Sequence, residues 1–475
     1  MTANSSWQVR TLGDCAKWYT GGTPSKSVLK YWNGDIPWIS AKSLTDFYVS
    51  DSEDKVTDEG ACNGTRLVPA NTILFVVRGM SLKSEFRLGI TTRPVTFNQD
   101  LKALIPNPDV DAVYLAYAIR AKTIEILRYV GEAGHGTGVL PTDIMQSLRI
   151  AIPSISEQKR IAKIAQTIDD KIDLNRRINQ TLEAMAQAIF KSWFVDFDPV
   201  KAKIAAIEQG QDPLRAAMRA ISGLSACGAQ AGKTDAELDQ MPREHHDQLT
   251  ATAALFPNEM EESALGEIPK GWSIKSVSDL ARFATGKTEV SSLTVENYIS
   301  TENMLEKRGG ISRATSLPAV ATVPTFKSGH VLISNIRPYF KKIWLARFDG
   351  GRSNDVLCFE TKEEGCQEFL YNLLYQDEFF EFMMRTSKGA KMPRGDKDAI
   401  ADWTFPCANQ ELRGVFSEKV RPFYSYIENL NVESRHLSTI RNTLLPKLFS
   451  GALQVAPNFI SNTNQKFSLR SAKCN

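Results

Sequence analysis

The sequence lacks several features that would reveal its function at once. Its seven cysteines are scattered, with no C-x-x-C pair, which is typical of free thiols in a reducing compartment rather than of a disulfide framework. No apolar run approaches roughly 18 residues and residues 1–10 are polar, so we expect neither a membrane span nor a secretory signal. The net charge is only +3, so total charge alone does not indicate a polyanionic partner. These absences predict a cytoplasmic protein without membrane contact.

Motifs of catalysis and metal binding are also missing. The fragments Gly232-Lys-Thr234 and Gly286-Lys-Thr288 resemble the end of a phosphate-binding loop, but Cys227 and Ala281 stand where that motif needs its first glycine. The five histidines form neither H-E-x-x-H nor a zinc pattern with cysteines, and there is no G-x-S-x-G elbow or paired-carboxylate nuclease motif. We therefore expect no metal, no cofactor, no catalytic residue and a function that is not enzymatic.

What the sequence does contain is one pattern that occurs twice. The shared residues recur first at a constant spacing, which then shrinks along the chain, as expected for two copies that diverged with small deletions. A two-fold repeat of this length predicts tandem domains rather than a solenoid. The matched residues are Trp7 and Trp272, Asp14 and Asp279, Thr23 and Thr288, Ile39-Ser40 and Ile299-Ser300, Leu74-Phe75 and Leu332-Ile333, and Gly136 and Gly389.

Both copies mix strand-like and helix-like segments, which predicts an α+β fold. In residues 7–153, apolar runs with strand character alternate with turns, and 113–127 carries apolar residues at helical spacing. Residues 270–406 repeat that order. Each copy ends in an apolar residue and a proline, Ile152-Pro153 and Phe405-Pro406, and the proline favours an extended exit from the domain.

A long helix is expected after each copy. Heptad spacing over 156–191 predicts a coiled-coil seam, and a second register runs over about 410–450, where Pro422 should kink or restart the helix. Asn175 in the first seam is either a polar layer that fixes register or a residue that faces solvent. The first seam consists of Ile161, Ile168, Asn175, Leu182 and Ile189 at a, with Ile164, Lys171, Ile178 and Met185 at d. The second consists of Val420, Ile427, Ser434, Arg441 and Leu448 at a, with Phe416, Phe423, Leu430, Leu437 and Leu444 at d.

These patterns predict six segments along the chain. We expect the domains at 1–153 and 266–407, and the helices at 154–196 and 408–451. Residues 197–265, rich in Ala, Gln and Gly, are interpreted as a partly helical and poorly packed connector, and 452–475 as a frayed polar tail.

Basic residues gather in a few loops that could contact DNA phosphates. The segment 385–397 carries five positive charges and one negative, whereas its counterpart 134–138 is rich in glycine. Each loop taken alone could equally be a solvated charged loop. The triplets Asn98-Gln99-Asp100 and Ser353-Asn354-Asp355 could read adenine, although a structural turn is the better interpretation. The candidate DNA-binding residues are Lys42, Arg78, Lys83, His135, Thr137, Arg337, Tyr339, Lys341, Lys342, Lys388, Lys391 and Arg394.

The helical and junction segments resemble a known family. Residues 184–199, the segment 265–272 that opens the second copy and the segment 444–451 that closes the second helix look like the specificity subunit of type I restriction–modification systems. The resemblance covers about residues 7–451, and the long connector departs from it.

That resemblance implies two target-recognition domains, each reading one part of a split, asymmetric site in double-stranded DNA. It also implies that the two helices pack antiparallel as a coiled-coil spacer. It further implies docking of two methyltransferase subunits, which motor–nuclease subunits join, with S-adenosylmethionine and ATP belonging to those partners. The alternatives are a self-contained DNA-modifying enzyme and a structural coiled-coil adaptor.

Overall fold

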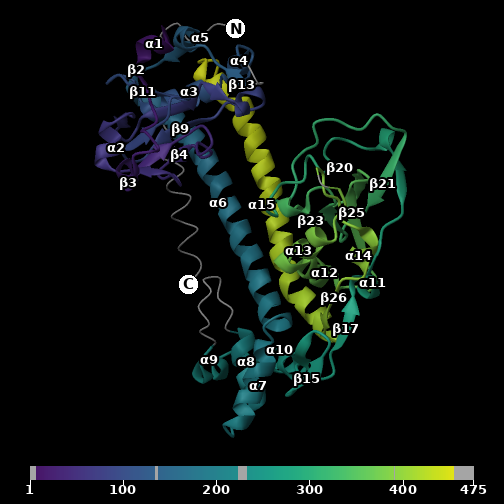
Figure 1. Cartoon of the computed structure of the whole chain (residues 1–475). Coiled ribbons are helices and arrows are strands. Elements are labelled where there is room, and N and C mark those ends of the chain that lie inside the picture. Colours follow the sequence, from purple (N-terminus) through teal and green to yellow (C-terminus); the bar gives the residue numbers. More distant parts are fainter. Residues whose placement is uncertain (1–6, 134–136, 223–232, 390, 454–475) are drawn as a thin grey trace. The chain divides into compact units, whose positions relative to one another are not determined.

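The computed structural model describes residues 7–133, 137–222, 233–389 and 391–453 and divides the chain into two compact units. The first unit comprises Met1–Leu174 with Glu433–Asn475, and the second comprises Asn175–Val432. Each unit holds one copy of the repeat and parts of two long helices, α6 (Ile155–Phe194) and α15 (Gln410–Phe449), as Figure 1 shows. The expected α+β fold is confirmed.

The first unit contains four small sheets. The largest has the strand order β2-β11-β7-β9-β4, and the others are β5-β3-β10-β6, β12-β13-β8 and β1-β14. The strands are β1 (Gln8–Thr11), β2 (Ala16–Thr20), β3 (Trp32–Ile39), β4 (Tyr48–Val49), β5 (Lys55–Val56), β6 (Leu67–Val68), β7 (Ile73–Val76), β8 (Arg78–Gly79), β9 (Leu88–Thr91), β10 (Val95–Phe97), β11 (Leu101–Pro106), β12 (Gly131–Ala133), β13 (Thr137–Val139) and β14 (Arg149–Ile152). The helices before α6 are α1 (Leu12–Cys15), η1 (Leu29–Tyr31), α2 (Asp58–Cys62), η2 (Met80–Lys83), α3 (Ala112–Arg120), α4 (Thr123–Leu127) and α5 (Thr142–Ser147).

The second unit repeats this plan and adds a helical insertion before it. Its sheets have the orders β18-β25-β22-β23, β19-β21-β24-β20, β17-β26 and β15-β16. The strands are β15 (Met260–Ser263), β16 (Gly266–Pro269), β17 (Ser273–Ser276), β18 (Ala281–Phe283), β19 (Lys287–Glu289), β20 (Tyr298–Ile299), β21 (Thr322–Phe326), β22 (Val331–Ser334), β23 (Ile343–Leu345), β24 (Gly350–Arg352), β25 (Val356–Thr361) and β26 (Thr404–Cys407). The helices between α6 and α15 are α7 (Asp198–Glu208), α8 (Pro213–Ser222), α9 (Asp235–Asp239), α10 (Arg243–Ala254), α11 (Val277–Leu280), η4 (Val290–Ser292), η5 (Pro338–Phe340), α12 (Gln367–Leu374), α13 (Asp377–Arg385) and α14 (Lys397–Ala401).

Strand pairing confirms the repeat residue by residue. Leu74-Phe75 of β7 pairs with β11 as Leu332-Ile333 of β22 pairs with β25, and β3 and β10 are parallel as β20 and β24 are. Gln8 pairs with Ile152 and Ser273 pairs with Cys407, so strand register makes Cys407 the equivalent of Ile152. The prolines that end the two copies, Pro153 and Pro406, therefore stand two residues apart in this register.

The recurring aspartates occupy the third position of the same short helix in each copy, where they bond with the N-cap residue, Thr11 or Ser276. Thr11 Oγ1 accepts a hydrogen bond from the Asp14 backbone amide at 3.2 Å, and the Ser276 backbone amide donates to Asp279 Oδ2 at 2.7 Å. Such caps satisfy backbone groups that a helix start leaves without partners. Gly136, the expected match of Gly389, lies outside the described residues.

The two long helices run in opposite directions where they meet in each unit. In the first unit Arg441 Nη1 donates to Asp169 Oδ1 at 2.7 Å, and in the second Asn179 Nδ2 donates to Asn431 Oδ1 at 2.8 Å. No a or d residue of either predicted seam is exposed, and the heptad registers themselves stay predictions. The expected restart at Pro422 is wrong, because α15 continues across this exposed proline.

Asn175 is fully buried, which excludes the alternative that it faces solvent. Its Nδ2 donates to the Leu430 carbonyl oxygen at 3.5 Å, so it forms the polar layer of the seam. A buried amide within an apolar seam favours one register, because any slip would move it opposite apolar side chains.

The connector is better packed than its composition predicts. Val200 of α7, Met218 of α8 and Phe256 after α10 are buried in the largest core cluster of the second unit. The Phe256 ring meets the Trp193 ring of α6 edge to face at 5.4 Å. The expectation of poor packing is wrong, since these apolar residues are spread thinly in sequence and gather only once α7 to α10 fold together.

Candidate nucleic-acid interface

In the first unit, strand pairing brings the basic loop 78–83 against the glycine-rich loop. Gly79 of β8 pairs with Gly138 of β13, and Lys83 Nζ lies 2.9 Å from Glu132 Oε1 of β12. Arg78 is exposed, and its backbone pairs with Val139 of β13, the strand that Thr137 begins. The structure therefore unites Arg78, Lys83 and Thr137, three residues that the sequence proposed separately.

Gly138 is required because the two loops approach so closely. A Cβ atom there would lie 2.9 Å from Leu82 Cβ and 3.2 Å from the Gly79 carbonyl oxygen. Leu82 is buried in this contact and anchors η2 to the domain. Lys42 is 91% exposed, and the neighbouring Ala41 is close to Gly79, so Lys42 borders the same loop. His135 lies outside the described residues.

In the second unit, the corresponding loops also meet. Arg394 forms β-bridges with both Ile336 and Lys388, and the Arg337 amide donates to the Pro393 carbonyl oxygen at 2.8 Å. Arg337, Lys388 and Arg394 are exposed there, and Lys391 is exposed in the same segment. Four of the candidate cations therefore share one surface, which we call the second basic loop pair (336–342 with 385–397).

Several of these cations already have partners within the chain. Lys341 Nζ lies 2.5 Å from Asp377 Oδ1, Lys342 Nζ donates to the Thr301 carbonyl oxygen at 2.8 Å, and Arg394 pairs with Asp355 at 3.3 Å. Lys388 pairs with Asp396, and this carboxylate raises the pKa of the lysine. Ion pairs at such exposed positions contribute little, because solvent screens them, so a phosphate can displace Asp396 or Asp355. Lys341 and Lys342 are half-buried, and their main role is to hold the loop in place.

The backbone of this region is held in an uncommon conformation. Lys307, Arg308, Arg337 and Lys341 all have positive φ angles, of 53°, 61°, 51° and 50°. The left-handed region costs a residue with a Cβ on the order of 1 kcal/mol, and such residues gather at ligand-binding sites. The Lys307 amide donates to the Phe340 carbonyl oxygen at 2.8 Å and the Arg308 amide to the Lys341 carbonyl oxygen at 2.9 Å, which holds the segments together.

Lys307 is a candidate that the sequence analysis missed. It is exposed, and its backbone is bonded directly to the second basic loop pair. The sequence signal was the run Lys307-Arg308-Gly-Gly310, whose basic and glycine residues resemble those of the other loops. Arg308 instead turns inward, where its guanidinium donates to the Tyr375 carbonyl oxygen at 3.0 Å.

The polar triplets have a structural role. Asn98 Oδ1 accepts from the Asp100 amide at 3.1 Å, and Ser353 Oγ accepts from the Asp355 amide at 3.2 Å. The Asp100 carbonyl oxygen in turn accepts from the Arg78 amide at 3.3 Å. Each triplet closes a turn beneath a basic loop, as the structural interpretation predicted.

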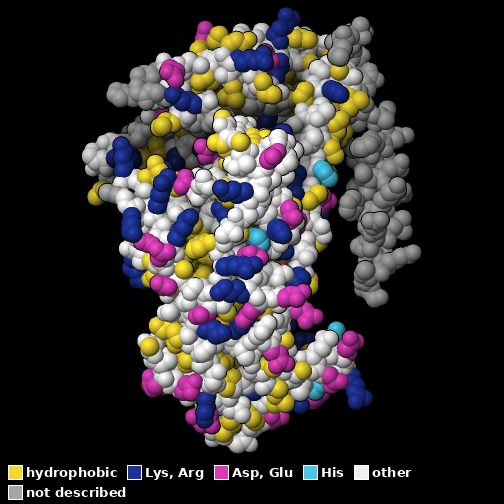
Figure 2. All heavy atoms as spheres, turned by 90° about the vertical axis from the view of Figure 1, so that its right-hand side faces the viewer, with side chains coloured by type: hydrophobic (Ala, Val, Ile, Leu, Met, Phe, Trp, Pro, Cys, Tyr) yellow, Lys and Arg dark blue, Asp and Glu magenta, His cyan; other side chains and the backbone are white. Residues whose placement is uncertain are grey.

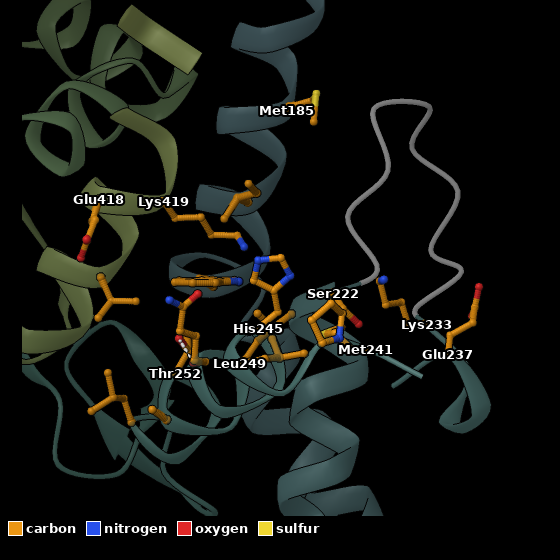
Figure 3. Close-up of a pocket in the computed structure, with 18 of the residues that line it drawn as sticks. Met185, Ser222, Lys233, Glu237, Met241, His245, Leu249, Thr252, Glu418 and Lys419 are labelled. Carbon is orange, nitrogen blue, oxygen red and sulfur yellow. Dashed lines mark hydrogen bonds between the residues drawn. The ribbon is translucent and has the colours of Figure 1, made fainter. Parts of the chain in front are cut away.

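Outside the basic loops, the described surface offers few other candidate binding sites. A hollow of about 940 Å³ in the second unit lies between the connector and the long helices, lined by Met185, His245, Lys419 and others (Figure 3). Within the described ranges, no group of His, Cys, Asp and Glu side chains could hold a metal ion, and no helix is long and apolar enough for a bilayer. On the face in Figure 2, basic and acidic side chains are interspersed, consistent with the small net charge.

In comparisons with known proteins, the chain is similar to specificity subunits of type I restriction enzymes. A family model described as the type I restriction modification DNA specificity domain matches residues 4–184. The specificity subunit of the type I restriction enzyme HindI of Haemophilus influenzae is 28% identical over 438 residues, covering 81% of this chain and 89% of that protein. The MjaIX specificity subunit of Methanocaldococcus jannaschii is 24% identical and covers 94% of each chain. The EcoR124I/EcoR124II specificity subunit of Escherichia coli is 38% identical over 162 residues, covering 34% of this chain and 40% of that protein.

A solved structure described as the S subunit of a type I restriction–modification system from M. genitalium aligns with 94% of this chain and 98% of its own. The TM-score is 0.49 and the sequence identity 13%, so this likeness carries no argument by itself.

Proposed function

We propose that this chain, which resembles the specificity subunits of type I restriction–modification systems, is such a subunit, and that each of its two repeated domains reads one half of a bipartite, asymmetric DNA site. The relatives are named specificity subunits, so this chain is the DNA-recognition component rather than the catalytic one. The observation that carries the proposal is the repeat itself, in which two domains of equivalent strand register each end in a 40-residue helix.

The two copies share the residues of their frame but differ in their loops, which supports the proposal that they read two different half-sites. The caps at Asp14 and Asp279 and the paired strands are common to both copies, whereas the loops around Gly138 and Arg394 differ. Phosphate contacts position a protein on DNA, and base contacts specify the sequence. A common frame with unlike loops is therefore what two readers of unlike sequences need.

The candidate DNA contacts are the basic loops of each domain. In the first domain, one half-site would be contacted by Lys42, Arg78, Lys83, His135 and Thr137. In the second, Arg337, Lys388, Lys391 and Arg394 would contact the other, joined by Lys307. Tyr339 would contribute its ring, whereas Lys341 and Lys342 would act mainly by holding the loop.

We expect the helix pair to set the distance between the half-sites. A helix rises about 1.5 Å per residue, so each 40-residue helix spans about 60 Å. The seam residues Ile161, Ile168, Asn175, Leu182, Ile189, Ile427, Leu437 and Leu444 would keep this spacer at a fixed length.

Docking of two methyltransferase subunits, joined by motor–nuclease subunits, is proposed for the helical segments. Specificity subunits work in complexes with DNA and other subunits of the restriction–modification system. The long helices, the turn after α6, and α7 expose single large apolar side chains beyond those that the seam uses, and these are positions where another subunit could pack. These residues are Ile155, Leu174, Val195, Ile207, Tyr426 and Ile440.

The test combines methylation profiling with a change in helix length. Profiling DNA from cells that express the complete complex should give one bipartite motif with two unlike halves. Inserting one turn into 160–190 and a matching turn into 412–445 should then change the spacer length of the motif and leave both half-site sequences unchanged. A turn is about four residues.

A matched control places four residues after Gly210 in the exposed turn between α7 and α8, where a side chain would meet no neighbouring atom. This insertion should leave the motif unaltered. Unchanged spacing in the helix variant would contradict the spacer role, and a single undivided motif in the parent would contradict two-part reading.

A further inference from the structure

Two turns, 98–100 in the first domain and 353–355 in the second, occupy equivalent positions in the two copies. Each turn follows a strand that runs parallel to an earlier one, β10 beside β3 and β24 beside β20. The first residue of each turn donates its backbone amide to the carbonyl oxygen of a matched isoleucine, Ile39 at 2.9 Å or Ile299 at 2.8 Å. The two turns therefore begin at the same place in the fold.

The far end of each turn is also fixed in the same way. The carbonyl oxygen of its third residue accepts a hydrogen bond from the residue after β7 or β22, Val77 at 2.9 Å or Asn335 at 2.8 Å. These bonds belong to a different pair of strands from the first, so two independent registers agree. They make Gln99 and Asn354, the middle residues of the two turns, structurally equivalent.

Only the middle residue of each turn is exposed, and in both copies it carries a primary amide. Thr23 Oγ1 donates to Gln99 Oε1 at 2.7 Å, which leaves the amide nitrogen of Gln99 without an acceptor among the described residues. The Asn354 side chain forms no hydrogen bond within the same described part of the chain. Each turn therefore presents an amide N–H donor to the surface on a backbone that is held at both ends.

Each turn lies directly against a basic loop. The Arg78 amide donates to the Asp100 carbonyl oxygen at 3.3 Å, and the Asp355 carboxylate pairs with the Arg394 guanidinium at 3.3 Å. Each exposed amide is therefore one residue away from a residue that contacts a candidate phosphate-binding arginine. The arginines come from different loops of the repeat, 78–83 and 385–397, whereas the amide recurs at one position.

We propose that Gln99 and Asn354 donate hydrogen bonds to DNA phosphates, one in each half of the site, and position their domains without reading bases. The inference rests on the proposed function and adds an uncharged anchor to the basic loops. Amide side chains bond to phosphate oxygens, and such contacts set register and orientation but carry no sequence information. Two domains that read unlike sequences can share this part of recognition, which is where a recurring side chain fits.

Reading of adenine is the alternative role for an exposed amide. It uses the amide oxygen and nitrogen together, with the oxygen accepting from adenine N6 and the nitrogen donating to N7. Gln99 Oε1 already accepts from Thr23, a residue that itself recurs as Thr288. The nitrogen alone remains, and one donor suffices for a phosphate oxygen. The geometry at Gln99 therefore favours a phosphate over a base.

The experiment uses the full chain assembled with the other subunits of its own system. Binding to the two-part site is measured over a range of salt concentrations, and the motif is selected from DNA in which both half-sites are randomised. Gln99→Ala and Asn354→Ala should each weaken binding by roughly 2- to 10-fold, the value of one net hydrogen bond. The selected motif should not change. The slope of log K against log salt should also stay the same, since a neutral amide releases no counterion.

Acidic substitutions at the same positions sharpen the test. Gln99→Glu keeps an oxygen that can accept from Thr23, so the turn stays intact, but its carboxylate repels a phosphate. Gln99→Glu and Asn354→Asp should therefore weaken binding more than the alanine variants do. Gln211→Ala and Gln211→Glu, in the exposed turn between α7 and α8, are the matched controls and should change neither affinity nor motif.

Three results would contradict these expectations, each in a different way. A changed base preference at one half-site would overturn the phosphate assignment and indicate a base contact. Unchanged affinity in both the alanine and the acidic variants would remove Gln99 and Asn354 from the interface. Failure of the wild type to select any two-part motif would instead overturn the proposed function.

Discussion

One carboxylate, that of Asp169 in α6, links the domain of the first unit to both long helices. Its oxygens accept hydrogen bonds from Tyr117 Oη at 2.9 Å, Arg120 Nη1 at 2.6 Å and Arg441 Nη1 at 2.7 Å. Tyr117 and Arg120 belong to α3 of the domain, and Arg441 belongs to α15. We predict that Asp169→Ala destabilises the first unit far more than an ordinary loss of surface charge.

The size of the effect follows from burial. The Asp169 side chain is 14% exposed and that of Arg441 is 18% exposed, so removing the carboxylate leaves two guanidinium groups and a phenol poorly solvated. Removing one partner of a buried ion pair costs about 3–5 kcal/mol. The Arg120 side chain is 31% exposed and can reach water, so we expect a loss of stability at the lower end of this range, about 3 kcal/mol. For a unit of roughly 200 residues this lowers the melting temperature by roughly 6–12 °C.

The assay is scanning calorimetry of the full chain, with hydrogen exchange of α3 peptides to assign the transition to the first unit. Asp170→Ala is the matched control, because it removes the same charge from the next residue of α6, whose side chain is exposed. Asp169→Asn should fall between the two, since its amide oxygen still accepts one hydrogen bond. Equal shifts for Asp169→Ala and Asp170→Ala would refute the reasoning.

Three further predictions concern the second unit. Burial raises the pKa of the Glu183 carboxyl above its ordinary value of 4.5. The contribution of Glu183 to stability is therefore fully present below pH 4.5 and is lost as pH rises through the raised pKa. In denaturant titrations, Glu183→Gln should remove this fall in stability with pH. Phe256→Ala should cost about 3–5 kcal/mol in urea unfolding, whereas Ile207→Ala, at a 49% exposed position of α7, should cost little, and equal losses would contradict a packed connector. Lys391→Ala with Arg394→Ala should weaken DNA binding and lower the slope of log K against log salt by about 0.9 for each lost phosphate contact. Arg243→Ala in α10, 96% exposed, should change neither, and an unchanged slope for the loop variant would remove that loop from the interface.

The repeat and the heptad registers could be predicted because both are local patterns. Trp272 and Asp279 stand in the same order as Trp7 and Asp14, and Asn175 occupies an a position whatever the rest of the chain does. The equivalence of Ile152 with Cys407 could not be read from the sequence, because strand pairing decides register. Pro422 failed as a breaker since its ring lies on the exposed side of a helix that tertiary packing holds together.

The candidate interface was predictable as a set of residues but not as a surface. Arg337 and Arg394 lie far apart in sequence, and the bridge at Ile336 and the bond from the Arg337 amide to Pro393 bring them together. Nothing in the local sequence says that Lys341 is engaged by Asp377 or that Lys307 joins the loop. Such contacts depend on chain segments that are distant in sequence.

The sequence by itself therefore determined that this protein has two copies of one domain, each followed by a helix with an apolar seam. Periodicity and repetition are properties of neighbouring residues, and folding preserves them. Only the tertiary structure decided that α7 to α10 belong to the core of the second unit and that Asp169 joins a domain to both helices. It also decided which cations remain exposed, because burial and ion pairing are set by long-range contacts that no local pattern records.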